Sequence, residues 1–467
     1  MVTYFPQIIS RKAMMYYFIT LAVVSALFIN QILPFIWIVF GVVEVYTFFY
    51  FSNDLTKKWG RLSPKAFVKK LFRTALIIRL VYVVFAYFFY DAMTGQPFMF
   101  FSADEQVYFN VSKVWREHGF EAFRNTMRGF GIDDSGELYF TGFLCKIFGT
   151  YILVARIAHS LLSALTCLLI YRIAKRHFGE STARMAAIFC MLMPNLIYYC
   201  GIHLKEADVV FVAVLFVDSV DALFTERKFD VMQLVLALFS GFAMFTFRTV
   251  LGAVGVIALG VAFAFSRGPI GSWWKRIVLV VLVVISLGST SIGLRIMSEV
   301  DTAWSRRELN QEVGMEARAQ SKGGNSFARF GSRAVFAPLI FTIPFPTMIY
   351  VEGQQNQQML NGGNFVKNVM SGFTVFALAI LLLNGEWRKH ILPIALMGGY
   401  LFVIASSNFA HSERFHQPAL PFELMFAAYG ISQLKAKQVK WIDYWLLLIL
   451  VANVGWAWIK LAGRGLA

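Results

Sequence analysis

Long apolar runs separated by shorter polar segments dominate the sequence. A helix needs about 20 mainly apolar residues to cross a bilayer, and the sequence contains about 13 runs of suitable length. They lie near residues 13–30, 33–51, 74–91, 150–173, 183–200, 206–224, 231–247, 249–265, 277–296, 369–384, 391–407, 418–434 and 441–461. The pattern predicts an all-α polytopic membrane protein with about 13 transmembrane helices.

Composition excludes the other broad protein classes. Of 467 residues, 58% are hydrophobic and 15% are charged, whereas soluble domains carry about 25% charged residues. A soluble cytosolic enzyme, a disordered chain and a disulfide scaffold are therefore excluded. The four cysteines form no CxxC pair, so we predict neither a disulfide nor a zinc site from them.

The formal net charge is +16, and the positions of the basic residues along the chain are more informative than this total. Lys and Arg collect on the cytoplasmic side of membrane proteins. With a cytoplasmic N-terminus, each short inner segment carries basic residues; these segments are 52–73, 172–184, 225–230, 266–276, 385–390 and 435–440. This orientation leaves two long segments outside, 92–149 and 298–368, which we expect to bear amphipathic helices.

The apolar run at 334–350 is too irregular for an ordinary span, because it is short and contains Pro338, Pro344 and Pro346. If it crossed the membrane, the later basic loops would lie outside. We therefore predict a re-entrant or interfacial segment, or one packed against protein. The chain then divides into a two-span anchor with a basic cytoplasmic loop (1–73), a core that includes the first outer loop (74–297), a second outer loop (298–368) and the C-terminal spans (369–467).

Adjacent carboxylates stand near the start of the first outer segment. Asp104 and Glu105 follow a predicted span closely, and Tyr108, a possible substrate contact, lies one helical turn after Asp104. A carboxylate held where water is partly excluded can act as a general base. The alternative is that Asp104 caps a helix that begins near Glu105.

Two predicted spans meet near Gly201, so His203, Lys205 and Glu206 are expected at the outer surface. Lys205 is suited to contact a phosphate there, and His203 is a possible substrate contact. The alternative is that Lys205 and Glu206 end a helix and extend to the lipid headgroups. Arg248 lies at an outer hinge, against the positive-inside bias, and an anionic partner would explain it.

The last outer segment packs His411, Glu413, Arg414 and His416 into six residues. The guanidinium of Arg414 offers a planar fork for phosphate or carboxylate, and Glu413 and His416 are possible substrate contacts. The two histidines are five residues apart and do not share a helix face. We therefore favour phosphate or sugar contact there and predict no metal site.

Nucleotide-binding motifs are missing from suitable contexts, since no Walker A motif, GxGxxG fingerprint or GxSxG elbow follows a predicted strand. A reaction on the outer loops then needs a substrate that is already activated. A lipid-phosphate-linked sugar is the natural donor. The sequence requires no cofactor, leaves the role of a divalent metal open, and gives no reason to expect a nucleic acid partner.

These features resemble the GT-C glycosyltransferases, in particular the branch that uses polyprenyl-phosphate sugars and includes protein O-mannosyltransferases and lipid A aminoarabinose transferases. The DE at Asp104 and Glu105 opens the first outer loop, as in that branch. Residues 141–194 resemble its third-to-fourth-span segment, and ERFHQPALPFELMFAAYG resembles its late arginine–proline element. Two further spans precede the loop that carries DE, and segment 298–368 matches no acceptor region that we can specify.

The resemblance implies a GT-C-like bundle in a bacterial plasma membrane, with its active site on the extracytoplasmic face. It implies that Asp104 is the catalytic base and Glu105 a secondary acidic contact. The acceptor hydroxyl would displace polyprenyl phosphate with inversion at the sugar. The residues that would bind the leaving phosphate are Lys205, Arg248 and Arg414.

Two other functions stay open. A polysaccharide polymerase or O-antigen ligase would act on a lipid-pyrophosphate glycan and use arginines in a large outer loop, such as those between Arg306 and Arg333. A transporter or flippase for a lipid-linked sugar would need polar residues at the bilayer midplane, for which Glu44, Arg79 and His159 are the candidates. In each case the partners are a lipid-linked sugar and membrane lipids, and a transferase adds a lipid, glycan or protein acceptor.

Overall fold

A computed structural model describes residues 3–225, 230–265, 339–405, 410, 412–435, 438 and 440–466 of the chain. This part of the chain is mainly helical and contains one isolated antiparallel bridge, between Ile32 and Ile349. Its helices are α1 (Gln7–Leu27), α2 (Phe35–Trp59), α3 (Pro64–Thr94), α4 (Ala103–Met127), α5 (Ile132–Phe148), α6 (Ile152–Phe178), α7 (Glu180–Leu192), α8 (Pro194–Cys200), α9 (Glu206–Thr225), α10 (Val231–Phe247), α11 (Thr249–Phe265), α17 (Gln355–Met359), α18 (Asn361–Leu383), α19 (Ile391–Ala405), α20 (Glu413–His416), α21 (Leu420–Ser432) and α22 (Trp441–Ala462), with 3₁₀ turns η1 (Ile29–Gln31) and η2 (Trp387–His390).

The structure confirms the predicted all-α polytopic class. Within the described residues, seven helices are long and apolar enough to cross a membrane, or eight if the bent pair α7–α8 is one span. Helices α10, α11 and α21 are apolar but shorter. Each predicted run inside the described residues coincides with a helix or with this bent pair, whereas the run at 277–296 lies outside them. The predicted number of about 13 spans is not confirmed.

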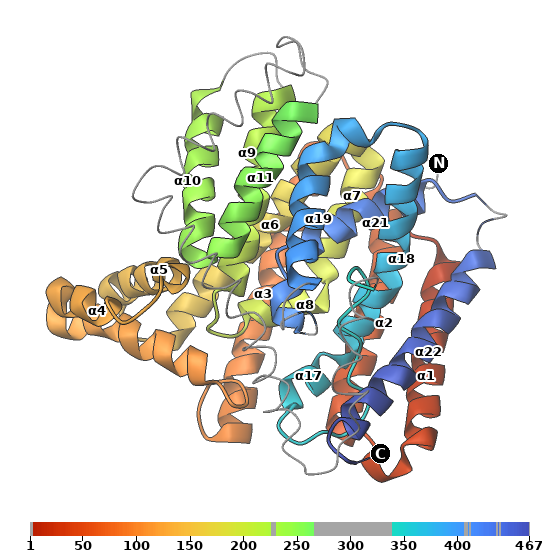
Figure 1. Cartoon of the computed structure of the whole chain (residues 1–467), viewed down its shortest axis with the longest axis horizontal. Helices are drawn as coiled ribbons and strands as arrows, with labels where there is room; N and C mark the ends of the chain where they lie inside the picture. The colour runs from red at the N-terminus through yellow and green to blue at the C-terminus, as the bar shows by residue number, and fades with distance from the viewer. Residues whose placement is uncertain are drawn as a thin grey trace.

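Helices α4 and α5 form a separate pair that projects from one side of the bundle (Figure 1). They pack on each other, and α5 also packs against α10. The aromatic rings of Trp115, Phe120, Phe123 and Tyr139 hold the pair together, with ring centroids 5.0–6.4 Å apart. Segment 92–149 therefore contains helices, as the sequence predicts.

Two long helices extend beyond their apolar runs. The hydroxyl of Ser63 accepts a hydrogen bond from Ala66 N at 3.4 Å, and Pro64 is the first residue of α3, an arrangement that favours a helix start. Helix α18 likewise begins at Asn361. Both helices therefore run across the predicted segment boundaries, after residues 73 and 368, because polar residues continue a helix past the end of its apolar stretch.

Helices α2 and α18 approach each other closely at glycines. A Cβ atom added at Gly362 would lie 2.3 Å from the carbonyl oxygen of Gly41, so neither position has room for a side chain. Beside this contact, Glu44 Oε2 accepts a hydrogen bond from Gly363 N at 2.8 Å. The carboxylate thus satisfies an N–H group that is left free in the first turn of α18.

The span formed by α7 and α8 is bent by 51° where the helix breaks. Pro194 begins α8 and has no N–H to donate to the carbonyl of Cys190. Arg79 on α3 takes over this function: Nη2 lies 3.2 Å from Cys190 O, and Nη1 lies 3.3 Å from Met191 O. Its Nε also donates to Ser163 Oγ at 2.7 Å. The fully buried Arg79 therefore satisfies the carbonyls that the break exposes.

The part of segment 334–350 that the structure describes, residues 339–350, has irregular backbone buried against α18. Lys367 Nζ donates to Ile343 O at 2.5 Å, and Asn368 Nδ2 donates to the carbonyls of Thr342 and Pro344. Non-helical backbone at membrane depth is tolerated where protein groups satisfy it. Side chains of α18 therefore satisfy the irregular backbone of residues 339–350.

Basic residues gather at the α2–α3, α6–α7 and α18–α19 connections. They are Lys57 and Lys58 at the end of α2, Lys175, Arg176 and His177 at the end of α6, and Arg388, Lys389 and His390 in η2. On α7, Arg184 Nη1 donates to the carbonyls of Trp59, Gly60 and Leu62 at 2.8–3.0 Å. This contact closes the C-terminal end of α2 and ties it to α7.

Candidate active site

Asp104 lies in the first turn of α4, and its side chain is 55% exposed. Ser102 occupies the N-cap position of this helix, so Asp104 does not act as the cap. Its Oδ2 lies 2.6 Å from Nη1 of Arg414, which comes from α20 near the other end of the chain. An exposed carboxylate is thereby held against a guanidinium.

Arg414 also contacts a buried carboxylate in the interior of the protein. Its Nε lies 2.5 Å from Glu206 Oε1 at the start of α9, and the same oxygen lies 2.9 Å from Arg248 Nη2. Arg248 Nη1 donates to the hydroxyl of Tyr400 at 2.9 Å. Since Glu206 is fully buried, its single carboxylate holds two guanidinium groups in fixed positions.

Lys205 forms a second ion pair beside the first. Its Nζ lies 2.6 Å from Asp134 Oδ1 and 2.7 Å from the carbonyl of Asp133. The hydroxyl of Tyr108 donates to the same Asp134 oxygen at 2.6 Å. Burial acts to raise the pKa of Asp134, but the Lys205 ammonium and these hydrogen bonds outweigh burial and lower it. Asp134 therefore stays ionised and keeps Lys205 at the start of α9.

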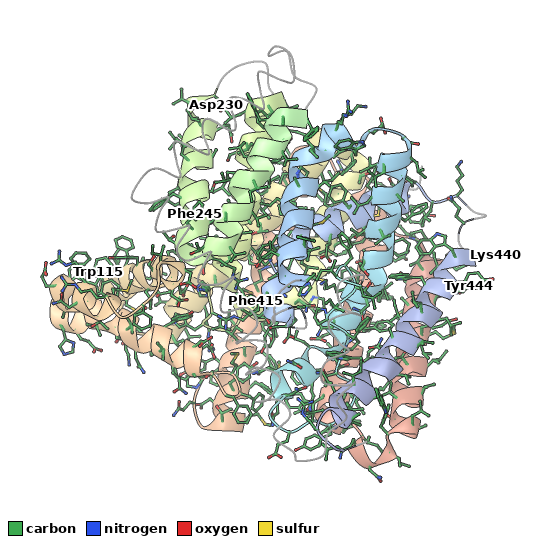
Figure 2. All side chains as sticks on the ribbon, viewed as in Figure 1. Trp115, Asp230, Phe245, Phe415, Lys440 and Tyr444 are labelled. Atoms are coloured by element: carbon green, nitrogen blue, oxygen red, sulfur yellow. The ribbon has the colours of Figure 1, made fainter. Side chains whose placement is uncertain are left out.

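These contacts unite residues from five separate parts of the chain. We call them the ionic cluster: Asp104, Asp134, Lys205, Glu206, Arg248 and Arg414. It contains three carboxylates and three cations among the described residues. Phe415, near the centre of the view in Figure 2, lies beside it, with its ring 4.7 Å from the Arg248 guanidinium. The structure thus brings together Asp104 and the three predicted phosphate-binding residues.

Glu105 is turned inward, although it is adjacent to Asp104. It is fully buried, and its oxygens accept hydrogen bonds from Met99 N at 2.7 Å, Arg156 Nη2 at 3.2 Å and the backbone N–H of His203. These bonds join the start of α4 to α6 and to the loop before α9. The burial favours a positioning role over the acidic substrate contact that the resemblance implies.

The other possible substrate contacts are also buried. His416 bonds to Lys367 Nζ at 2.9 Å and to Ala410 O at 2.7 Å, and Glu413 as a whole residue is 7% exposed. His203 is fully buried, and burial lowers its pKa to about 3. Its imidazole is therefore uncharged. His411 lies outside the described residues.

One group of buried residues could hold a metal ion within the described part of the chain. Glu137, His159 and His203 each offer a ligand atom, and these atoms lie within 4.8 Å of one another. The sequence analysis missed this group because its members are far apart along the chain. It also missed Asp134 and Tyr400 as partners of Lys205 and Arg248, since such pairs are defined only by the folded chain.

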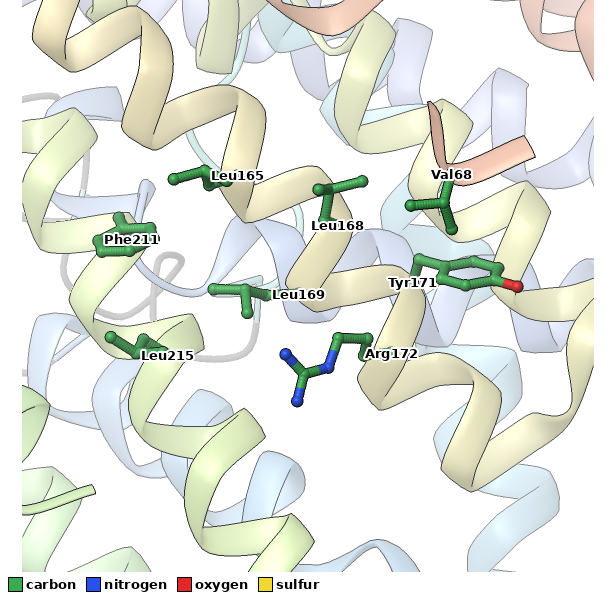
Figure 3. A pocket seen from close by; sticks show the side chains of 8 residues that line it. All are labelled: Val68, Leu165, Leu168, Leu169, Tyr171, Arg172, Phe211 and Leu215. Atoms are coloured by element: carbon green, nitrogen blue, oxygen red, sulfur yellow. The ribbon is translucent and has the colours of Figure 1, made fainter. Parts of the chain in front are cut away.

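An apolar groove of about 380 Å³ lies apart from the ionic cluster, between α3, α6 and α9 (Figure 3). None of its lining residues belongs to the cluster; they are Val68, Leu165, Leu168, Leu169, Tyr171, Arg172, Phe211 and Leu215. Arg172 at its edge also pairs with Asp218 at 3.2 Å. The groove is lined mostly by hydrocarbon and offers few polar groups for sugar recognition.

Comparison with known proteins links part of this architecture to a family. Residues 137–292 match the sequence model of the dolichyl-phosphate-mannose-protein mannosyltransferases. A search of curated protein sequences gives no match. Among solved structures, the Archaeoglobus fulgidus oligosaccharyltransferase in complex with Zn and sulfate is similar with 12% identity and a TM-score of 0.44, over 84% of this chain and 52% of that chain. The chain thus spans about half the length of that protein.

The matched region contains much of the candidate site. It begins at Glu137 and includes Lys205, Glu206 and Arg248, whereas Asp104 and Arg414 lie outside it. The family match confirms, for residues 137–292, the resemblance to the GT-C superfamily of membrane glycosyltransferases that the sequence predicts.

Proposed function

We propose that the chain is an integral-membrane glycosyltransferase that moves a sugar from a polyprenyl-phosphate donor to an acceptor hydroxyl. The observation that carries this proposal is the contact between Asp104 and Arg414. It combines a carboxylate open to an acceptor with a cation suited to phosphate, 2.6 Å apart. The family match supports the same reaction class.

Asp104 is the proposed general base. The acceptor hydroxyl gives its proton to an Asp104 oxygen, and the acceptor oxygen forms a bond to the anomeric carbon of the sugar. The bond from that carbon to the donor phosphate breaks, and its electron pair leaves with the phosphate oxygen. Attack from the face opposite the leaving group inverts the anomeric configuration.

The three cations of the ionic cluster are proposed to stabilise the leaving phosphate. Fixed cations near developing negative charge lower the barrier because they need no rearrangement during the reaction. Glu206 supplies this fixation for Arg248 and Arg414 through contacts of 2.9 and 2.5 Å. A donor phosphate is expected to replace Asp104 as a partner of Arg414, which frees the Asp104 carboxylate for the acceptor.

The distribution of basic residues supports an extracytoplasmic site. The ionic cluster lies where α9 and α11 begin and α10 and α19 end. The basic residues at the end of α6 and in η2 lie at the opposite ends of neighbouring helices. Because basic residues mark the cytoplasmic side, the cluster is assigned to the other face of the membrane.

The contacts of two of the three intramembrane candidates, Arg79 and Glu44, support a transferase over a transporter. Arg79 bonds to the carbonyls at the α7–α8 break, and Glu44 bonds to the first turn of α18. Both side chains therefore serve the helices themselves. A polar path for a sugar through the bilayer would need such groups to be available to the substrate.

Replacement of Asp104 by Asn tests the proposal. With membrane abundance held equal, Asp104→Asn is expected to reduce glycan transfer by about 10²-fold or more, because a general base contributes about 10²–10⁴. Donor binding should be retained. Asp133→Asn is the matched control, since Asp133 is exposed nearby and contributes only its backbone carbonyl to Lys205.

The readouts are the transfer rate, followed with a polyprenyl-phosphate-linked sugar, and the affinity for that donor. Partial recovery in Asp104→Glu would support a role for the carboxylate itself. Near-normal transfer by Asp104→Asn would remove Asp104 from the mechanism and contradict the proposed site.

A further inference from the structure

Four ionisable side chains meet in the interior beside the ionic cluster. Glu137 comes from α5, His159 from α6, His203 from the loop between α8 and α9, and Asp208 from α9. Each is at most 1% exposed. His159 Nε2 lies 3.1 Å from Asp208 Oδ2 and 3.7 Å from Glu137 Oε1. We call these residues the buried group.

The side chains of the buried group lack hydrogen-bond partners. Both oxygens of Glu137, both oxygens of Asp208 and both ring nitrogens of His159 and His203 are buried without a hydrogen bond. Buried polar groups are nearly always satisfied, since desolvation without compensation is costly. One imidazole nitrogen, His159 Nε2, is shared between both carboxylates, at 3.1 and 3.7 Å, and the second imidazole, that of His203, has no hydrogen bond at either nitrogen.

Nearby cations do not supply the missing charge. The positive charge of Arg156 is balanced by Glu105, whose Oε1 lies 3.2 Å from Nη2, although Nε and Nη1 of this arginine are buried without a hydrogen bond. Lys205 follows His203 closely in the sequence but bonds to Asp134 at 2.6 Å. A divalent cation bound between the carboxylates of Glu137 and Asp208 would balance their two negative charges, and both already lie within 3.7 Å of His159 Nε2.

The types and spacing of these atoms fit a transition metal. A tetrahedral Zn²⁺ ion binds imidazole nitrogen and carboxylate oxygen at about 2.0–2.2 Å, so its ligand atoms lie about 3.4 Å apart. The distances of 3.1 and 3.7 Å around His159 Nε2 bracket this value. The ligand atoms of Glu137, His159 and His203 lie within 4.8 Å of one another. Small side-chain movements would therefore bring all three within binding distance of one ion.

We propose that Glu137, His159, His203 and Asp208 bind one divalent transition metal ion, with Zn²⁺ as the best fit. The ion positions the active site and does not contact the substrate. It ties α5, α6 and α9 to the loop that carries Lys205, and the backbone N–H of His203 bonds to Glu105, the neighbour of Asp104. The metal therefore fixes the start of α9, where Lys205 and Glu206 stand.

The experiment measures metal directly and needs no activity assay. The full chain is purified through a tag without histidine, incubated with Zn²⁺, washed, and analysed by mass spectrometry for metal per chain. About one equivalent is expected for the wild type. His203→Leu and Glu137→Gln should retain much less, whereas His118→Leu, which changes an exposed histidine on α4, should match the wild type.

A conservative variant separates metal loss from misfolding. Cysteine is also a zinc ligand, so His203→Cys should keep the metal, and a chelator should lower the melting temperature of the wild type but not of His203→Leu. Loading with Co²⁺ should give the visible absorption of a tetrahedral complex. Metal content at background in the Zn²⁺-treated wild type, or equal content in His203→Leu, would overturn the proposal without bearing on the transferase reaction.

Discussion

Arg414 is the residue that joins the acid and the cations of the ionic cluster. Its Nη1 contacts Asp104 at 2.6 Å, while its Nε contacts Glu206 at 2.5 Å. A guanidinium can serve two carboxylates in this way because its donors point in fixed, different directions. A lysine ammonium is a single point charge and cannot reproduce both contacts.

Arg414→Lys is therefore expected to reduce transfer strongly, although the charge is kept. The expected loss is about 10²-fold, comparable with removal of one fixed group that stabilises developing charge. The transfer rate and the donor affinity check this. Arg388→Lys, at an exposed position in η2, is the control and should behave like the wild type. If both variants transferred sugar at the same rate, the contact of Arg414 with two carboxylates would not be needed for transfer.

At the scale of single residues, the sequence predicts some residues of the candidate site and does not predict others. Adjacent helical residues point about 100° apart, because a turn contains about 3.6 residues, so Asp104 and Glu105 cannot face the same way. One is half exposed and the other fully buried. The residue types predicted Asp104 and Arg414 as candidates, but Tyr400 carries no local signal, since only the folded chain brings it to Arg248.

At the scale of elements, the broken span depends on a residue from another helix. The α7–α8 break leaves carbonyls that the helix cannot satisfy, and Arg79 on α3 bonds to two of them. An intramembrane arginine that suggests a transport path in the sequence thus has a structural function. The proline was visible in the sequence, but its compensating partner was not.

Arg79→Leu is expected to destabilise the protein, because each unsatisfied buried carbonyl costs about 1–3 kcal/mol. Pro194→Ala introduces an N–H that can bond to Cys190 O. The double variant should therefore recover part of the lost melting temperature. Arg73→Leu, an exposed change on the same helix, should have little effect. A double variant no more stable than Arg79→Leu would contradict the link between Arg79 and the break.

At the scale of the whole molecule, the apolar pattern gave the order of helices in the described residues. Their ends were less predictable, as α3 and α18 begin in polar residues. The contacts between distant segments could not be predicted at all. Glu137, His159 and His203 meet only after α5, α6 and the loop before α9 have packed, because no short spacing joins them.

The orientation of the molecule gives a prediction for single introduced cysteines. All four native cysteines are buried, so an introduced thiol should dominate labelling. A membrane-impermeant maleimide is expected to label Gln96→Cys in intact cells, because Gln96 is exposed and bonds to Gln106 in the first turn of α4, which also carries Asp104. Gly385→Cys, beside the basic turn η2, should react only after permeabilisation. The reverse pattern would assign the ionic cluster to the cytoplasmic face.

The exposure of Asp104 determines how this residue can lose its proton at the end of a reaction cycle. If Asp104 takes the acceptor proton, the phosphate departs with one more negative charge than it had in the donor, and the proton stays behind. The six side chains of the ionic cluster regain their equal numbers of carboxylates and cations only when that proton leaves. Because the carboxyl is 55% exposed, the proton can pass directly to bulk water. Regeneration of the enzyme then requires no internal relay of proton carriers.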